Sequence, residues 1–175
     1  MSNPLPLTMQ QQRQHNWCWA AVATSVAQFV DNPTQWTQCM LASTQLNQGN
    51  DGCCSDGDNP DTCDKIAHLE TSLSLVGHRS PVQPNPSPGM AGTDVIKQEI
   101  DGGRPLGVRI GWDDSLDQGH FVLVTGYDDS TSDFVVMIND PEKPDGSPPN
   151  PYSYDGLKQN GYQSSGTWTH TYFTS

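Results

Sequence analysis

A proline- and glycine-rich stretch, residues 80–92, divides the chain of 175 residues into two parts with different hydrophobic patterns. Before this stretch, apolar residues recur at helical spacing, which predicts amphipathic helices. After it, runs rich in Val, Ile and Phe predict strands. Helices in one part and strands in the other indicate an α+β fold rather than an alternating α/β fold. The length suits one domain over residues 1–175, with a helical half at about 12–79 and a strand half at about 93–175.

The expected elements can be given by their residue ranges. Residues 1–11 resemble an extended arm, and residues 140–151 a proline-rich loop. In the third predicted helix the inner stripe is Ile66, Leu69, Leu73 and Val76, and in the fourth the capping residue is Thr93. Helices are predicted at 18–30, 34–46, 64–76 and 93–100, strands at 105–112, 119–127, 134–139 and 166–174, and one helical turn at 154–160.

The net charge and the hydropathy of the chain argue against two classes of partner, nucleic acids and membranes. The formal net charge of −12 argues against nucleic acid, because phosphates require Lys and Arg. No apolar run approaches the roughly 18 residues of a membrane span, so we expect no membrane partner. The first residues do not show the charged and then apolar segments of a secretory signal. We expect a monomer that needs no cofactor.

The chain has five cysteines, and four of them lie in one segment rich in Gly, Asp, Asn and Ser. Such a segment buries little, so cross-links would compensate. The simplest interpretation is two disulfides among Cys39, Cys53, Cys54 and Cys63, with Cys18 left free. The adjacent Cys53 and Cys54 are each expected to reach Cys39 or Cys63. Reduced thiols and a four-cysteine zinc site are the alternatives, although zinc ligands usually come as two C-x₂₋₄-C pairs, so no metal is expected. Disulfides predict an oxidising compartment, hence a secreted or extracellular protein, or one delivered into a host cell.

Cys18 lies between two tryptophans at the point where a polar run becomes a helix. A thiolate is the reactive form of cysteine, and a helix N-terminus stabilises negative charge. That field contributes only about 0.3–1 kcal/mol, so an activated thiol also needs a neighbouring imidazolium. The alternative is an inert cysteine buried between the two indoles.

A histidine and a carboxylate are predicted to meet at the open end of a hairpin. If the turn is centred near Ser130, His120 lies opposite Asp140, and directly opposed residues have Cβ atoms roughly 4.5–5.5 Å apart. A carboxylate bound to imidazole fixes its tautomer and stabilises the imidazolium. A register error of one residue would bring Asn139 there instead. The other histidines are expected to be structural or exposed: His15, His68, His78 and His170.

An acyl-transfer site also needs hydrogen-bond donors for the oxyanion. The backbone N–H of Cys18 is free if this residue lies in the first helical turn. A second donor could be the side-chain amide of Gln12 or of Gln14, and spacing alone does not choose between them.

Taken together, these residues resemble the papain-like cysteine proteases, and in particular the bacterial branch of secreted effector proteases. The resemblance rests on the segment Asn16–Ala21 (Asn-Trp-Cys-Trp-Ala-Ala), on Gln12 six residues before the cysteine, on Gly119-His120 and on Asp140. It implies a helical half and a sheet or barrel half with a cleft between them. It also implies hydrolysis of a protein or peptide substrate through a thioester acyl-enzyme.

The same resemblance assigns roles. Cys18 would be the nucleophile, His120 the base and then the acid, and Asp140 the group that orients the histidine. Gln12, together with the Cys18 N–H, would bind the oxyanion. The residues expected to contact substrate are Trp17, Trp19 and Gly119.

The chain departs from the family pattern after the third triad member. Many papain relatives have a tryptophan near this point that shields the histidine, whereas here Pro141-Glu142 follows Asp140. Trp112 is a candidate for that shield. The same triad would also serve an amidase, a transpeptidase or a deamidase. A catalytically silent binding module of the same fold, or a disulfide-rich structural protein, are the further alternatives.

Overall fold

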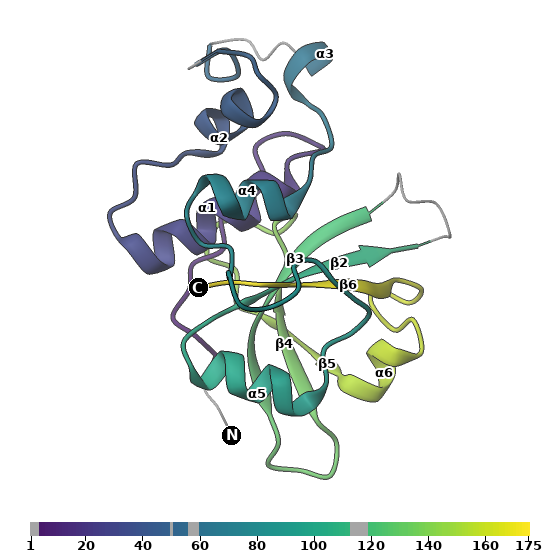
Figure 1. The fold of residues 1–175 in the computed structure, drawn as a ribbon. Helices are drawn as coiled ribbons and strands as arrows, with labels where there is room; N and C mark the ends of the chain where they lie inside the picture. The colour runs from purple at the N-terminus through teal and green to yellow at the C-terminus, as the bar shows by residue number, and fades with distance from the viewer. Residues whose placement is uncertain (1–3, 50, 56–59, 113–118) are drawn as a thin grey trace.

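The computed structural model describes residues 4–49, 51–55, 60–112 and 119–175. The chain forms N-terminal helices followed by a six-stranded antiparallel sheet, as predicted, with strand order β1-β6-β2-β3-β4-β5 (Figure 1). The helices are α1 (Cys18–Asp31), α2 (Gln38–Gln45), α3 (Pro60–Cys63), α4 (Leu69–Leu75), α5 (Thr93–Asp101) and α6 (Tyr154–Lys158). The strands are β1 (Ser87–Pro88), β2 (Leu106–Gly111), β3 (Gly119–Asp128), β4 (Val135–Asn139), β5 (Asn150–Ser153) and β6 (Thr167–Phe173). None of the described helices is long and apolar enough to cross a bilayer.

Helix α1 is the central element of the helical half. Every residue from Cys18 to Ala27 is buried, because the helix contacts α2, α4 and strand β3 on different sides. Small side chains make this possible, since Ala20, Ala21 and Ala23 are fully inaccessible and allow neighbouring elements to approach closely. The nucleophile candidate therefore starts a helix that is held on several sides.

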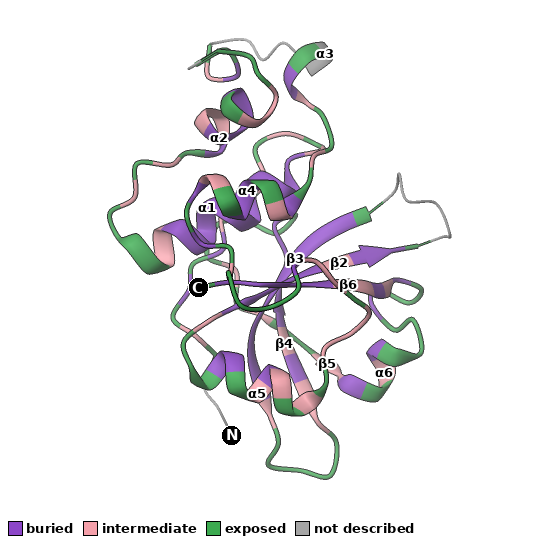
Figure 2. Cartoon of the chain, in the orientation of Figure 1, coloured by how far each residue is buried: buried purple, intermediate pink, exposed green. Residues whose placement is uncertain are grey.

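The sheet is covered on both faces, which explains the nearly continuous apolar run of β3. Phe121 and Leu123 pack with α1 and α4, whereas Val122 and Val124 pack in the second core with α5 and α6. Burial in Figure 2 is continuous through the centre of the sheet and along the sides of the helices that face it. The sheet thus separates two hydrophobic cores, one on each of its faces.

Three helix predictions need correction. The second helix begins at Gln38, not Thr34, because the Thr37 hydroxyl accepts a bond from the Met40 N–H and caps it. The third begins at Leu69, not Asp64, and Ile66 is 61% exposed, so it is not part of the inner stripe. Thr93 is the first residue of α5 and not its cap, because Gly92 occupies the capping position.

Two strands were not predicted. β1 lies in the stretch 80–92, which was expected to be a loop, and β5 lies at the end of the loop expected at 140–151 and pairs with β4, from Ile138–Asn150 to Val135–Ser153. The sequence of β5 contains Pro151, which lacks a backbone donor and is compatible only with an edge position. The strand is indeed at the edge of the sheet.

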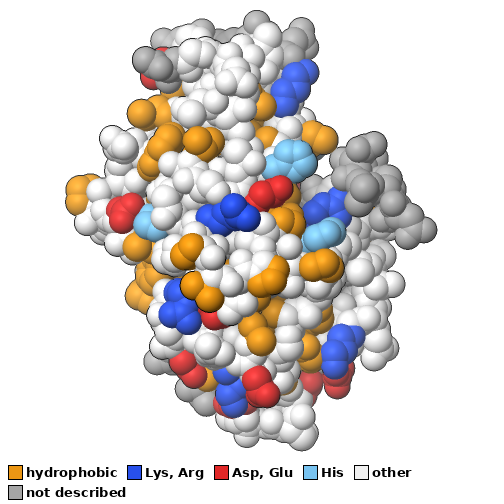
Figure 3. Space-filling model, viewed as in Figure 1, with side chains coloured by type: hydrophobic (Ala, Val, Ile, Leu, Met, Phe, Trp, Pro, Cys, Tyr) orange, Lys and Arg blue, Asp and Glu red, His pale blue; other side chains and the backbone are white. Residues whose placement is uncertain are grey.

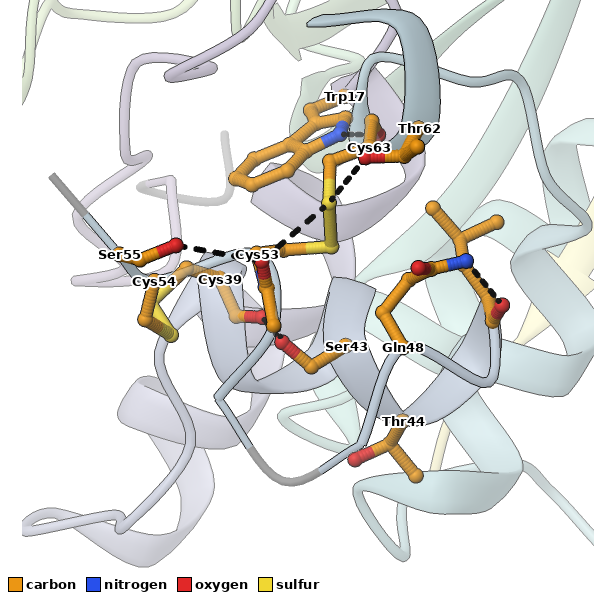
Figure 4. The surroundings of a disulfide bond; sticks show 12 residues. Trp17, Cys39, Ser43, Thr44, Gln48, Cys53, Cys54, Ser55, Thr62 and Cys63 are labelled. Atoms are coloured by element: carbon orange, nitrogen blue, oxygen red, sulfur yellow. Dashed lines mark hydrogen bonds between the residues drawn. A yellow bond between two sulfur atoms is a disulfide. The ribbon is translucent and has the colours of Figure 1, made fainter. Parts of the chain in front are cut away.

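The disulfide prediction is confirmed. Cys39 is bonded to Cys54, Cys53 is bonded to Cys63, and Cys18 is free (Figure 4). The two bonds connect the start of α2 and the end of α3 to the loop between them. With these four sulfurs in disulfides, neither the reduced state nor the zinc site describes this structure.

Candidate active site

Cys18 is the first residue of α1 and is 8% exposed. The turn before it closes by a hydrogen bond from the Trp17 N–H to the Gln14 carbonyl, at 3.2 Å. Its own N–H belongs to the first helical turn, where N–H groups have no acceptor within the helix. The thiol therefore sits at the positive end of a long, buried helix.

His120 and Asp140 come together, although the predicted register was wrong by two residues. The last ladder pair is Leu123 with Asn139, and the register shifts between Val124 and Gly126. Asp140 is therefore level with Val122 and diagonal to His120. A shift of two residues keeps the same face of the sheet, because side chains alternate with a period of two.

The imidazole connects the thiol to the carboxylate. His120 Nε2 lies 2.7 Å from Asp140 Oδ1, and the Cys18 thiol is close enough to the imidazole to raise its pKa. Because Nε2 faces Asp140, Nδ1 is the ring nitrogen available to the thiol. The three side chains are buried, and the imidazole interacts with both the carboxylate and the thiol. The structure thus brings together the three residues predicted to form the triad.

The electrostatics favour a protonated histidine beside an ionised carboxylate. Burial alone would lower the pKa of His120, but the bonds to Asp140 and Cys18 outweigh it and raise this pKa to about 10. Burial would likewise raise the pKa of Asp140, but hydrogen bonds from His120, the Glu142 N–H and Tyr162 hold it below its ordinary value.

A second set of contacts orients the carboxylate. The Tyr162 hydroxyl donates to Asp140 Oδ2 at 2.7 Å, and Gln163 Nε2 donates to the same oxygen at 3.1 Å. The Glu142 N–H donates to Oδ1 at 2.9 Å. Sequence reasoning missed Tyr162 and Gln163, because both lie just before β6, far from Asp140 along the chain. No local pattern in the sequence marks them.

Trp112 lies beside the histidine. Its ring centroid is 6.4 Å from that of His120 and 6.2 Å from that of Tyr162. This arrangement agrees with the expected shielding role. Asn139 has a different function: it accepts a bond from Thr125 at 2.6 Å and donates to the Ser147 carbonyl at 3.1 Å. It therefore fixes the loop after β4 and does not replace Asp140.

Cys18 opens onto a groove of about 300 Å³ between the helical half and the sheet. Its apolar walls include Ala67, Phe121 and Tyr172, and charged or titratable groups stand among them. Figure 3 shows histidine, acidic and basic side chains gathered with hydrophobic ones between α4 and the sheet. The lining residues that carry these groups are His68, Glu70, Arg109 and His170.

Two of the three predicted substrate contacts line this groove, and the third does not. Gly119 is exposed and lines it next to Cys18, and Trp19 lines it although only 1% of the residue is exposed. Trp17 does not line this groove: it is 2% exposed, and its indole N–H donates to the Cys63 carbonyl. The prediction for Trp17 is wrong, because this side chain is part of the core.

The family follows from a comparison of the whole chain with known protein families. A family model described as the "Peptidase_C39 like family" matches residues 4–174. The chain belongs to this family. No curated protein matches the chain in the corresponding search. The Peptidase C39-like family is part of the papain-like cysteine peptidases, so the match agrees with the fold and with the resemblance from the sequence.

In this Peptidase C39-like chain the two oxyanion candidates differ in their contacts. Gln12 Nε2 donates to the carbonyls of Gln14 and His15, at 3.2 and 2.6 Å, and its Oε1 is buried without a partner among the residues that the structure describes. Both amide N–H groups of Gln12 are therefore engaged by the turn itself. Gln14 lines a different groove, together with Trp36. The role of Gln12 stays a prediction, as does the absence of a cofactor.

One group of ligating side chains in the described part of the chain is close enough to hold a metal ion. It consists of His120, Asp140 and the exposed Glu142, with the ligand atoms within 4.8 Å of one another. The histidine nitrogen in this group already faces the carboxylate at 2.7 Å. In this family member His120 and Asp140 are thus hydrogen-bonded to each other and are not arranged around a metal ion.

The remaining histidines of this C39-like domain have other surroundings. His78 Nε2 lies 2.8 Å from Asp31 and its Nδ1 lies 3.1 Å from the last carbonyl of the chain, so it ties the C-terminus to α1. His68 is on the rim of the groove, 3.7 Å from Glu70. His170 lines the groove, and burial together with Arg109 lowers its pKa.

Proposed function

We propose that this chain is a cysteine endopeptidase that hydrolyses peptide bonds through Cys18, His120 and Asp140. The observation that carries the proposal is the 2.7 Å hydrogen bond between His120 and Asp140, with the Cys18 thiol beside the imidazole and on the wall of a groove. Family membership supports a cysteine peptidase. The individual roles below are our inference from the geometry.

In the first half-reaction the Cys18 thiolate attacks the carbonyl carbon of the scissile bond. The carbonyl oxygen becomes an oxyanion and accepts a hydrogen bond from the Cys18 N–H at the start of α1. Gln12 is the candidate for a second donor, which requires its amide to leave the carbonyls of the turn. The imidazolium of His120 then gives its proton to the leaving amine, and a thioester remains on Cys18.

In the second half-reaction His120 acts as a base. It takes a proton from water, the resulting hydroxide attacks the thioester, and the carboxylic acid leaves as the Cys18 thiolate re-forms. Asp140 keeps one imidazole nitrogen occupied, so that the other always faces the thiol. Trp112 limits access of bulk water to that pair.

The wider proposal includes the setting of the enzyme. The Trp17-Cys18-Trp19-Ala20-Ala21 segment supports an assignment to the bacterial effector-type branch. The two disulfides support an oxidising, extracytoplasmic location. We propose that the chain acts as a single-domain monomer on protein or peptide substrates and binds no nucleic acid.

The decisive experiment is a digest of casein and of a peptide library by the wild type and by Cys18→Ala. We expect cleavage by the wild type, none by the variant, and the same circular dichroism spectrum for both. His120→Ala should lose almost all turnover, and Asp140→Ala should lose less. Equal turnover of His120→Ala and wild type would refute the assignment.

Product analysis separates hydrolysis from other thiol acyl transfers. Digestion in H₂¹⁸O with glycinamide present gives ¹⁸O-labelled acids if water is the acceptor, and amide-capped products if the enzyme is a transpeptidase. Iodoacetamide at pH 5–6 tests the silent binding module. An active thiolate is alkylated faster than a small-molecule thiol, whereas the silent module predicts the same rate.

A further inference from the structure

Three consecutive residues, which begin with the last residue of α3, hold the turn that carries Cys18. The Trp17 indole N–H donates to the Cys63 carbonyl at 2.7 Å, and the Trp19 indole N–H donates to the Lys65 carbonyl at 3.0 Å. Between them, Asp64 Oδ1 accepts the backbone N–H of Asn16 at 2.6 Å. Both neighbours of the nucleophile in the chain are thus bonded to the segment 63–65, which we call the clasp.

Asp64 makes two contacts with Asn16, the residue before the capping position of α1. Its side chain accepts the Asn16 N–H, and its backbone carbonyl accepts Asn16 Nδ2 at 3.2 Å. These bonds fix Asn16 two residues before Cys18, where the chain changes from loop to helix. No side chain caps α1, since its capping residue is Trp17 and makes no such bond. The clasp therefore fixes the chain just before this helix, where no side chain caps it.

The clasp itself is not part of a long helix or of the sheet. It begins at the last residue of α3, a helix of four residues, and from Asp64 the chain stays non-helical until Leu69. Its next residue, Ile66, is 61% exposed, so little apolar packing fixes it on that side. A segment with these features would move readily unless something else holds it.

A disulfide supplies that restraint. Cys63, the first residue of the clasp, is bonded to Cys53, which is buried and whose N–H donates to Ser43 Oγ on α2 at 2.9 Å. Figure 4 shows this connection running from Ser43 through Cys53 and Cys63 to the Trp17 indole. The second disulfide, Cys39–Cys54, joins the same loop to α2 but includes no residue of the clasp.

We propose that Asp64 is a positioning residue for the Cys18 nucleophile, and that the Cys53–Cys63 disulfide holds it in place, so that reduction of this bond lowers turnover. The proposal rests on the proposed function. A dithiol would transfer two electrons and two protons to the disulfide, leaving two cysteine thiols and a cyclic disulfide of the reagent. The enzyme would then need an oxidised clasp and a reduced Cys18 at the same time.

The side-chain part of the proposal is tested with Asp64→Ala and Asp64→Asn. A misplacement of about 1 Å can cost roughly a hundredfold in rate. We therefore expect kcat of Asp64→Ala to fall by about ten- to a hundredfold with a much smaller change in KM. Asp64→Asn retains an oxygen acceptor for the Asn16 N–H and should recover most of the loss. Equal kcat of Asp64→Ala and wild type, per titrated active site, would overturn it.

The disulfide part is tested with the pair Cys53→Ser/Cys63→Ser, and Cys39→Ser/Cys54→Ser is the matched control. Both variants lose one disulfide from the same loop, but only the first releases the clasp. We expect lower turnover and slower alkylation of Cys18 by iodoacetamide in the first variant only. Dithiothreitol should inactivate the wild type and the control, and should change the first variant little. Equal loss in both variants, or in neither, contradicts the proposal.

Amide exchange gives a readout that does not depend on peptidase activity. In NMR spectra of wild type and variants, the indole N–H protons of Trp17 and Trp19 and the backbone N–H of Asn16 report the clasp bonds directly. Faster exchange at these sites in Cys53→Ser/Cys63→Ser, but not in the control variant, supports the proposal even if no peptide is cleaved. Absence of cleavage by the wild type would count against the proposed function alone, whereas unchanged exchange would count against the clasp.

Discussion

The Tyr162 hydroxyl donates a 2.7 Å hydrogen bond to Asp140 Oδ2, the carboxylate oxygen opposite the one that faces His120. Tyr162 is 1% exposed, and its ring stacks on Tyr152 with centroids 5.0 Å apart. The carboxylate is thus held from two sides: His120 uses one oxygen and Tyr162 the other. This arrangement fixes the plane of the carboxylate and, through it, the imidazole.

Tyr162→Phe should weaken catalysis while leaving the ring packing in place. A hydrogen bond to a charged group contributes about 1.5–3 kcal/mol, so we expect kcat/KM to fall by about ten- to a hundredfold. The lost donor helps to keep the pKa of Asp140 low, so this pKa rises and the acid limb of the pH profile moves to higher pH. The control is Tyr152→Phe, which removes a neighbouring hydroxyl that does not bond Asp140. The same acid-limb shift in both variants would contradict this role.

Asp140→Asn should move the alkaline limb of the profile. The carboxylate raises the pKa of His120, so replacing it with a neutral amide lowers that pKa. Protonated His120 is then lost at lower pH, and kcat/KM should begin to fall at lower pH than in the wild type. Measurement of kcat/KM from pH 5 to 10 checks this. An unchanged alkaline limb, with only a lower plateau, would mean that Asp140 does not control the histidine.

The same pair should stabilise the folded protein within a defined pH window. His120 has its pKa raised from 6.5 to about 10, so its contribution is complete below 6.5 and is lost as pH rises through about 10. Asp140 has its pKa lowered from 3.8, so its contribution is present above 3.8 and is lost as pH falls below that value. The difference in unfolding free energy between the wild type and His120→Ala, from urea titrations, should therefore shrink at alkaline pH. A difference independent of pH would contradict the ion pair.

Sequence patterns were enough for the fold, and for the approach of His120 to Asp140, because those features depend on local periodicity and on the alternation of side chains between the two faces of a sheet. The hairpin prediction survived a register error of two residues, since His120 and Asp140 stay on one face when the shift is even. Two disulfides with Cys18 left free followed from the odd number of cysteines, whereas the adjacency of Cys53 and Cys54 left open which of them pairs with Cys39 and which with Cys63. An error of one residue would have replaced Asp140 by Asn139, which has a different role.

Features that depend on distant contacts were not predictable. Tyr162 reaches Asp140 only because the segment before β6 folds back beside β4, and no period in the sequence encodes that approach. Ile66 fits the helical stripe by spacing, yet the chain around it is held as a non-helical segment by contacts with the Cys18 turn. Trp17 looks like a substrate contact from its position, but the Cys63 carbonyl draws its indole into the core.

Gly107→Ala should change the shape of the groove, because the added methyl contacts residues that form or support its walls. A Cβ at this position of β2 would lie 2.9 Å from Leu69 Cδ2 and 3.0 Å from Tyr172 Cβ, closer than normal contacts. Leu69 begins α4 and Tyr172 lines the groove, so the added methyl pushes apart the two walls against which a substrate would lie. Overpacking of this kind costs about 1–3 kcal/mol, so we expect a lower midpoint in urea and a raised KM for peptide substrates.

Gly156→Ala in α6 is the control, because its Cβ would meet only ordinary contacts at 3.5 Å and longer. It should be neutral or slightly stabilising, since alanine is favoured over glycine in helices by about 0.5–1 kcal/mol. If Gly107→Ala retained both the midpoint and KM of the wild type, the close packing of β2 against α4 and β6 would not govern the width of the groove.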